Sequence, residues 1–207
     1  MDDPQVRQRV TQRYATMLRE ASSEGYRAVG WGSQASQHKR FEVLSEIGDL
    51  RGKTILDVGC GLGAFHSWLL EQGIEHSYHG CDITAEMVAR ARTRTGLETI
   101  YHGDVSELPQ DVAEQGFDYV FASGIFCFNP EGGLPAMLSG VSKMFALARR
   151  GIGFNSLSAL ADAQEADEFY AAPDECLKQC QHLSRFAVMR HDYHPADFTT
   201  YLYKDAP

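Results

Sequence analysis

One short segment constrains the fold more than any other, because it joins a buried strand to a turn with three glycines. Residues 53–58 (KTILDV) have the mostly apolar pattern of a central strand, and Gly59, Gly61 and Gly63 follow directly. Residues 64–72 then carry apolar side chains at helical spacing. A strand, a glycine-rich turn and a helix in this order are typical of a parallel sheet that binds a ligand at the carboxyl ends of its strands.

The rest of the chain alternates between strand and helix patterns. Short apolar runs with strand character recur, and helical spacing separates most of them. Strands that alternate with helices in this way form a parallel sheet with helices on both faces. The sequence therefore predicts an α/β, three-layer, Rossmann-like fold. Further strands are expected at 77–83, 99–102, 117–122 and 151–156, with helices at 84–92 and 134–149.

Both ends of the chain depart from this alternation. Residues 185–190 and 198–203 are strand patterns with no room for a helix between them, so we expect an antiparallel hairpin at the sheet edge. Helices are expected at 5–21 and 37–47, ahead of the first strand. We expect residues 1–50 to form an N-terminal helical lid over the ligand crevice. Residues 51–207 would then form the ligand-binding domain.

Composition narrows the class of partner. The 207 residues include 19 Lys and Arg against 28 Asp and Glu, a formal net charge of −9. This balance disfavours binding that depends on nucleic-acid phosphates or anionic lipid. No apolar run approaches the roughly 20 residues that span a bilayer, and the five cysteines include no CxxC pair. We expect a cytoplasmic monomer or homodimer with no nucleic-acid or membrane partner.

Three carboxylates are expected at strand ends beside the glycine turn. Asp57 precedes the turn, where a phosphate would gain nothing from a further negative charge and a positively charged ligand would. Asp82 ends the second strand, where it can accept both hydroxyls of a ribose, and Asp104 follows the third, where it can accept an adenine amino group. Residues 59–64 alone also satisfy the dinucleotide fingerprint, so a nicotinamide-dependent dehydrogenase stays open at this point.

Taken together, these segments resemble the class I S-adenosylmethionine-dependent methyltransferases. Residues 56–63 (LDVGCGLG) resemble motif I of that family, and 79–84 (HGCDIT) with Met87 resemble motif II. Residues 102–105 (HGDV) resemble its adenine-side motif. The resemblance covers roughly residues 38–203 and implies a seven-stranded, mostly parallel sheet completed by the antiparallel hairpin.

The resemblance implies S-adenosylmethionine as the cofactor and assigns roles to individual residues. Asp82 would hold the ribose and Asp104 the adenine, while Asp57 would lie toward the methionine amine. Arg40 is a candidate to pair with the carboxylate of the cofactor. The remaining residues expected to line the cofactor are Gly59, Gly61, Ile83, Met87, Val105, Ser123, Gly124 and Trp31.

The sequence does not identify the methyl acceptor. Methyl transfer is an in-line displacement that needs the nucleophile about 3–3.5 Å from the methyl carbon, so much of the catalysis is positioning. Asn155 and Ser156 at a strand end, and Tyr170 in the loop beyond, are the candidate catalytic residues. Asn129-Pro130 matches half of the Asn-Pro-Pro-aromatic motif of amino-group methyltransferases, but residues 131–132 depart from it.

Two clusters invite a metal interpretation that we do not adopt. His191 and His194 lie at the hairpin turn, and Cys176 and Cys180 are four residues apart on a predicted helix. Neither cluster has the further Cys or His spacing that completes a metal site, so we expect no metal.

The function predicted from these patterns is methyl transfer to a small molecule, in bacterial secondary metabolism. An alternative on the same fold is a cyclase, in which the cofactor's own amine attacks its γ-carbon and gives azetidine-2-carboxylate and methylthioadenosine. In that case Asn155, Ser156 or Tyr170 would hold the amine. A nicotinamide-dependent dehydrogenase and a cofactor-binding module without catalysis are less favoured by the same residues.

Overall fold

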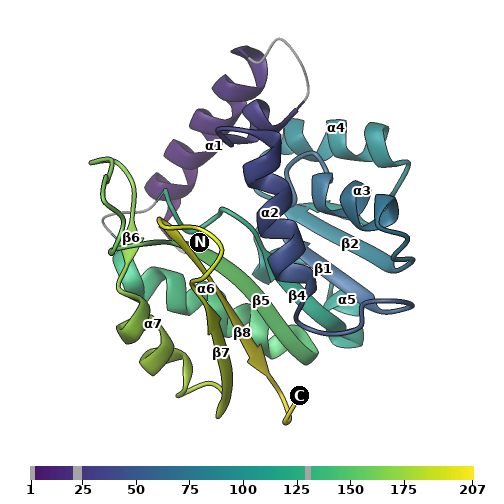
Figure 1. The fold of residues 1–207 in the computed structure, drawn as a ribbon. Coiled ribbons are helices and arrows are strands. Elements are labelled where there is room, and N and C mark those ends of the chain that lie inside the picture. The colour runs from purple at the N-terminus through teal and green to yellow at the C-terminus, as the bar shows by residue number, and fades with distance from the viewer. Residues whose placement is uncertain (1–2, 21–24, 129–131) are drawn as a thin grey trace.

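A single twisted sheet runs through the molecule (Figure 1). The computed structural model describes residues 3–20, 25–128 and 132–207. In this part of the chain the strand order is β3-β2-β1-β4-β5-β8-β7, and the two-residue β6 pairs with β5. The strands are β1 (Thr54–Val58), β2 (Ser77–Asp82), β3 (Ile100–His102), β4 (Phe117–Ala122), β5 (Ala148–Ser158), β6 (Tyr170–Ala171), β7 (Phe186–Arg190) and β8 (Asp197–Tyr203).

The pairing confirms the predicted α/β sheet and its antiparallel end. Strands β3, β2, β1, β4 and β5 are parallel neighbours. Strand β8 pairs antiparallel with both β5 and β7, so β7 forms the edge. The short β6 adds an eighth strand to the seven predicted. Two residues carry no periodic pattern, which explains why the sequence does not indicate it.

Helices cover both faces of this sheet, which confirms the three-layer arrangement. Helices α2, α3 and α4 pack on one face with Phe65 and Phe121, and α6 and α7 pack on the other with Val120 and Met144. Phe121 and Val120 are successive residues of β4, whose side chains alternate between the faces. The helices are α1 (Pro4–Glu20), η1 (Tyr26–Val29), α2 (Gln34–Ser45), α3 (Ala64–Glu71), α4 (Ala85–Thr95), η2 (Val105–Glu107), α5 (Gln110–Gln115), α6 (Gly133–Leu147) and α7 (Pro173–Cys180).

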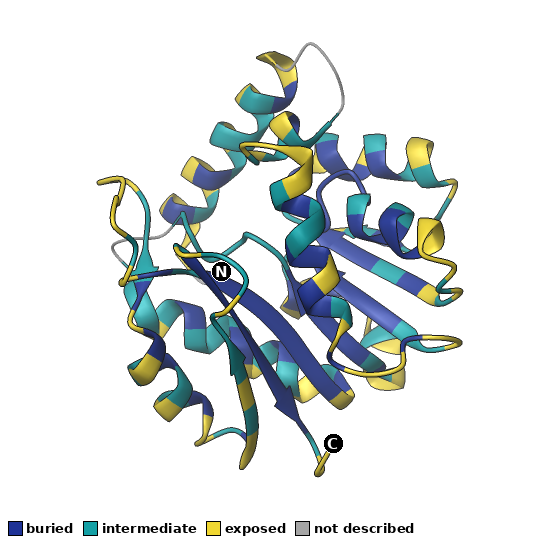
Figure 2. Cartoon of the chain, in the orientation of Figure 1, coloured by how far each residue is buried: buried dark blue, intermediate teal, exposed yellow. Residues whose placement is uncertain are grey.

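Burial follows from this layering. The central strands β1, β4 and β5 and strand β8 are almost entirely buried, whereas the edge strand β7 is partly exposed and the helices expose one side to solvent (Figure 2). Helix α2 begins at Gln34, earlier than expected, because the hydroxyl of Ser33 accepts a hydrogen bond from the Ser36 amide (3.1 Å) and caps it. Among the described residues, no helix is both long and apolar enough to cross a bilayer.

Helix α1 stands away from the sheet, above the carboxyl ends of the strands (Figure 1). Val6, Val10 and Leu18 are its buried residues, and their spacing puts them on one side of the helix. Ion pairs from Arg7 to Glu107 (2.7 Å) and from Arg13 to Asp167 (2.5 Å) join α1 to the rest of the protein.

Candidate active site

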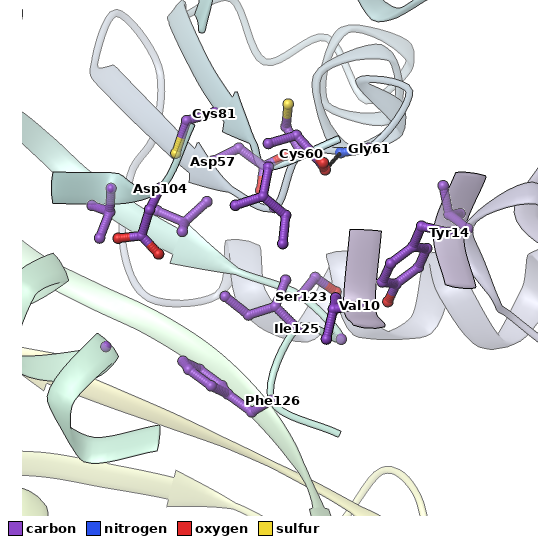
Figure 3. A pocket seen from close by; sticks show the side chains of 18 of the residues that line it. Val10, Tyr14, Asp57, Cys60, Gly61, Cys81, Asp104, Ser123, Ile125 and Phe126 are labelled. Atoms are coloured by element: carbon purple, nitrogen blue, oxygen red, sulfur yellow. Dashed lines mark hydrogen bonds between the residues drawn. The ribbon is translucent and has the colours of Figure 1, made fainter. Parts of the chain in front are cut away.

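The carboxyl ends of β1 to β4 open into a cavity of about 460 Å³. This volume lies within the range of roughly 300–1,000 Å³ that is usual for small-molecule sites. The strand ends and the glycine turn line one side of the cavity, and α1 and α6 line others. Figure 3 shows side chains from α1, from the strand ends and from the loop after β4 around the same space.

The glycine turn has a backbone that other residues rarely adopt. Gly59 and Gly61 have φ values of +72° and +53°. A Cβ atom on Gly59 would overlap the side chain of Ile125, and one on Gly61 would lie 3.0 Å from Cγ1 of Val29. The turn therefore leaves room only for a bare backbone, and both glycines line the cavity.

Asp82, at the end of β2, holds this turn in place. Its Oδ2 accepts a hydrogen bond from the amide of Gly61 (3.0 Å), and its Oδ1 accepts one from the amide of Thr84 (2.8 Å). Burial raises the pKa of the Asp82 carboxyl, while these two amide donors act in the opposite direction. Ile83 and Met87, which follow Asp82, also line the cavity.

Asp57, at the end of β1, is a buried carboxylate on the cavity wall. It is 3% exposed, and its Oδ2 accepts a hydrogen bond from the hydroxyl of Tyr78 (2.7 Å). Burial raises the pKa of Asp57 to about 7, against the lowering effect of the Tyr78 hydrogen bond, and the negative charge of Asp82 raises it further. The group can therefore change its charge near neutral pH.

Asp104 lines the cavity beyond β3, together with Val105. Its Oδ1 accepts hydrogen bonds from the amide (3.2 Å) and hydroxyl (3.0 Å) of Ser106, and its own amide donates to Glu107 (2.6 Å). These contacts make Asp104 the N-cap of η2, which fixes the carboxylate at this strand end.

Asn155 does not line the cavity but supports residues that do. Its Oδ1 accepts a hydrogen bond from the amide of Gly124 (2.7 Å), and its Nδ2 donates to the hydroxyl of Ser123 (3.3 Å). Ser123 and Gly124 both line the cavity, whereas Asn155 is 1% exposed. Asn155 therefore holds the loop after β4, and it does not itself reach the cavity where the sequence placed it as a candidate catalytic residue.

Ser156 and Tyr170 also lie outside the cavity lining. Strand β5 extends beyond Ser156, which is buried and opposite Phe198 of β8. The hydroxyl of Tyr170 donates to Glu168 (2.7 Å) and accepts from the amide of Glu165 (3.0 Å). The structure thus does not bring the three expected catalytic residues into the cavity, because β5 ends later than its sequence pattern suggests.

Arg40 has a different partner from the one expected. Its guanidinium forms an ion pair with Asp197 at the start of β8 (2.5 Å), and Arg40 is 4% exposed. The guanidinium also lies over the ring of Trp31, 4.8 Å from its centroid. Trp31 lines the cavity beside Gly124, and Arg40 does not. Arg40 therefore supports Trp31, while Asp197 neutralises the charge expected to pair with the cofactor carboxylate.

Several cavity residues lie outside the sequence motifs, although Tyr14 and Phe126 are among the aromatic residues that could face a sulfonium. Val6, Val10 and Tyr14 come from α1, Phe126 follows β4, and Met137 comes from α6. The hydroxyl of Tyr14 makes no hydrogen bond within the part of the chain that the structure describes. Burial raises the pKa of this phenol, so it is neutral at neutral pH. The spacing of four residues between Val6, Val10 and Tyr14 is the one signal in the sequence that indicates a shared helix face.

The clusters considered for a metal lie elsewhere. Cys176 and Cys180 lie on α7 and are buried in the core cluster that α7 shares with α6. The hairpin-turn residue Tyr193 hydrogen bonds to Asp197 (3.1 Å). In the described ranges no group of three or more His, Cys, Asp or Glu side chains is placed to hold a metal. Asn129-Pro130 lies outside the described residues.

Comparison with known proteins gives a consistent result. The family profile described as "Methyltransferase domain" matches residues 55–147. A Mycobacterium tuberculosis protein, Rv1506c, whose name provisionally assigns it as a methyltransferase, is 32% identical over 160 residues, which cover 70% of this chain and 90% of that protein. A tRNA U34 carboxymethyltransferase of Klebsiella pneumoniae is 34% identical over 93 residues, 44% of this chain but only 28% of that enzyme.

Solved structures share the fold at low sequence identity. The magnesium protoporphyrin IX methyltransferase of Synechocystis PCC 6803, solved with bound S-adenosylmethionine, superposes with a TM-score of 0.68 at 15% identity. The match covers 99% of this chain and 100% of that one. A methyltransferase of Archaeoglobus fulgidus, described as dependent on the same cofactor, gives a TM-score of 0.63 at 15% identity, over 84% of this chain and 95% of its own.

Proposed function

The chain belongs to the class I S-adenosylmethionine-dependent methyltransferases, and from this premise we propose that it methylates a small, largely apolar molecule. The resemblance stated from the sequence is confirmed, and with it the cofactor and the enzyme class. Membership of this family leaves no support for a dehydrogenase or for a module without catalysis.

The residues of the cavity fit this cofactor. The glycine turn offers a bare backbone, and Oδ1 of Asp57 accepts no hydrogen bond from the described residues while Asp57 lines the cavity. We propose that Asp57 binds the ammonium of the cofactor, Asp82 its ribose hydroxyls and Asp104 its adenine. When bound, the cofactor supplies an activated methyl group on a sulfonium. The apolar contacts would come from Ile83, Met87, Val105 and Trp31.

The remaining lining favours an uncharged acceptor. Val6, Val10, Phe126 and Met137 give this part of the cavity an apolar surface. Lys143 is the basic side chain among the described lining residues, and it already has an interaction partner. An anionic acceptor would therefore meet little positive charge, whereas an apolar one would gain free energy from burial.

Two hydroxyls supply polar contacts for the acceptor. Figure 3 shows Tyr14 and Val10 projecting from α1 toward Ser123 and Ile125. Ser123 accepts a hydrogen bond from Asn155 and donates none to the described residues, so its proton can point into the cavity. We propose that Tyr14 and Ser123 hold the nucleophilic atom in line with the methyl group. Tyr14, being neutral, orients the nucleophile through a hydrogen bond and does not act as a strong base.

The experiment follows the methyl label. Purified protein is incubated with methyl-tritiated S-adenosylmethionine and separate small-molecule, RNA and protein fractions of a bacterial extract. We expect label in the small-molecule fraction, and label only in RNA or protein would contradict the proposal. Tyr14→Phe should lower this transfer at least tenfold while S-adenosylhomocysteine still binds, because the phenol contacts the acceptor. Tyr26→Phe, on η1 outside the cavity lining, is the matched control.

Cyclisation of the cofactor gains no support from the arrangement of side chains. Asn155, Ser156 and Tyr170, which were expected to hold the amine, do not line the cavity. Incubation with the cofactor alone separates the two reactions, since methyl transfer requires an acceptor and cyclisation releases methylthioadenosine without one. The biological setting we propose, bacterial secondary metabolism, is supported only by the sequence resemblance to small methyltransferase-like proteins of such pathways.

We also propose that α1 and η1 form a lid over the cavity. The sequence indicates a cap of residues 1–50, but Phe41 and Leu44 of α2 belong to the core cluster on the sheet. Helix α1 contributes Val6 and Val10 to the cavity wall without joining that cluster, whereas α2 contributes Gln37 and Phe41 from its place on the sheet. The lid is therefore smaller than the predicted domain 1–50, and α2 belongs with the sheet.

A further inference from the structure

Tyr78 is the partner of the carboxylate to which we assign the cofactor's ammonium. Its hydroxyl donates to Oδ2 of Asp57 at 2.7 Å, and both residues are buried. The other oxygen of Asp57 is left for the cavity. Tyr78 itself is absent from the lining, so any effect of its hydroxyl on a ligand passes through Asp57.

The strand register explains how the two side chains meet. Asp57 of β1 lies opposite Gly80 of β2, and Tyr78 is two residues before Gly80 on the same face. Because Gly80 has no side chain, the phenol can extend diagonally to Asp57. A Cβ atom on Gly80 would lie 2.8 Å from the sulfur of Cys60 and 3.3 Å from Cε1 of Tyr78. Gly80 thus keeps open the space that the hydrogen bond needs.

The surroundings hold the phenol ring and supply no competing cation. The ring of His66 packs against that of Tyr78 with centroids 4.8 Å apart, and Nδ1 of His66 lies 3.0 Å from Nε2 of His76. Burial lowers the pKa of His66 to about 4 and also lowers that of His76, so both rings are neutral at neutral pH. Among titratable groups, Tyr78 and Asp82 shift the pKa of Asp57. The negative charge of Asp57 in turn raises the pKa of Cys60 and of Cys81.

We propose that Tyr78 is a positioning residue, whose hydroxyl orients Asp57 so that Oδ1 faces the cavity and binds the ammonium of the cofactor. The proposal rests on the assignment of Asp57 to the amino-acid end of the cofactor. It implies a selectivity that a purely structural tyrosine does not produce. Loss of the hydroxyl should lower the affinity for ligands that carry the amino-acid moiety. The affinity for methylthioadenosine, which lacks that moiety, should stay the same.

The test is isothermal titration of S-adenosylhomocysteine and methylthioadenosine into wild-type protein and Tyr78→Phe. We expect about a tenfold weaker affinity for S-adenosylhomocysteine, the scale of a hydrogen bond to a charged group, and an unchanged affinity for methylthioadenosine. Asp57→Asn should show the same selectivity, and Tyr78→Phe should add little in that background. Tyr201→Phe is the matched control, because Tyr201 is a buried tyrosine of the same core cluster whose hydroxyl donates to the carbonyl of Val43.

The pH profile provides a second measurement. The Tyr78 hydrogen bond lowers the pKa of Asp57, so its loss should raise that pKa above about 7. The pH at which S-adenosylhomocysteine affinity falls should therefore move upward in Tyr78→Phe. If that variant does not fold, Gly80→Ala is the second variant, because its Cβ atom would crowd both Cys60 of the glycine turn and the ring of Tyr78. Methylthioadenosine affinity then reports the effect on the turn, and any further loss for S-adenosylhomocysteine reports the effect on the phenol.

Three outcomes would overturn the proposal. An equal loss for both ligands would show that Tyr78 acts on the fold of the site, and no loss for either would show that Asp57 needs no orientation. The proposal would also be contradicted if Tyr78→Phe kept both the wild-type pH profile and the wild-type preference for S-adenosylhomocysteine over methylthioadenosine. Wild-type protein that bound neither ligand would instead overturn the cofactor site itself, and the role of Tyr78 with it.

Discussion

Asp57 is a residue whose burial opposes the stability of the fold. Its pKa is raised to about 7 in the folded protein, against about 3.9 for an unperturbed aspartate. The folded state therefore binds the proton more tightly than the unfolded state does. Asp57 therefore costs no stability below the pKa that it has in the unfolded chain. As the pH rises from that pKa to the pKa of the folded protein, deprotonation of the buried carboxyl lowers the free energy of unfolding. A positively charged ligand beside Asp57 would offset this cost.

Asp57→Asn should therefore stabilise the ligand-free protein at high pH and lower its affinity for the cofactor. The gain in the free energy of unfolding, relative to wild type, should increase between about pH 4 and pH 7 and stay constant above. Urea unfolding at pH 5 and pH 8 measures it. If Asp57→Asn changed the free energy of unfolding by the same amount at both pH values, the pKa of Asp57 would not be raised in the folded protein.

Asp82→Ala should lower the affinity for every ligand that contains the ribose. The variant loses the proposed ribose contact and also the two hydrogen bonds to the amides of Gly61 and Thr84. Affinity should fall at least tenfold, since hydrogen bonds to a charged group are worth about 1.5–3 kcal/mol each. Calorimetry with methylthioadenosine should show this loss, in contrast to Tyr78→Phe. Unchanged affinity would contradict the ribose assignment.

At the scale of elements, α1 is held by weak contacts and α2 by strong ones. The ion pairs Arg7–Glu107 and Arg13–Asp167 involve partly exposed side chains, and such pairs contribute little to stability. The pair Arg40–Asp197 is buried, and breaking it would leave an uncompensated charge. Helix α1 can therefore move away from the cavity at a lower cost in free energy than α2.

Removing these two surface ion pairs should accelerate ligand release. In the variant Arg7→Ala/Arg13→Ala we expect S-adenosylhomocysteine to dissociate severalfold faster, because the lid opens more often. The free energy of unfolding should change little, because exposed ion pairs contribute little to it. Stopped-flow displacement measures the rate. Arg51→Ala, which removes an exposed pair with Asp49 outside the cavity lining, is the control. A dissociation rate equal to that of wild type would show that α1 does not gate the cavity.

At the scale of the whole molecule, the cavity joins parts of the chain that are distant in sequence. Residues from α1, from the ends of β1 to β4 and from α6 line the same space. A ligand bound there connects the lid to both layers of helices. Its binding free energy adds to the stability of the folded state, because the unfolded chain has no such site.

A saturating ligand should therefore raise the midpoint of thermal unfolding. At a concentration 100 times its dissociation constant, S-adenosylhomocysteine adds about 2.7 kcal/mol, or about 5–10 °C for a chain of this length. Differential scanning fluorimetry measures the shift, with NAD at the same concentration as the control. A shift with NAD and none with S-adenosylhomocysteine would contradict the cofactor.

The sequence by itself determined the sheet, the glycine turn and the strand-end carboxylates. Strand periodicity, the turn at 59–63 and the positions of Asp57, Asp82 and Asp104 are properties of short segments, and adjacent parallel strands bring their ends together. Local patterns were therefore enough to predict the fold, and the residues that they assign to the cofactor line the cavity, apart from Arg40.

Only the tertiary structure decided which side chains face the cavity and which support it. Arg40 meets Asp197, 157 positions later, and Asn155 reaches back to the loop after β4. Tyr14 enters the cavity because α1 lies across the strand ends. Such contacts depend on how whole elements pack, since a buried charge or amide bonds to whichever partner the packing places beside it. No short stretch of sequence contains that information.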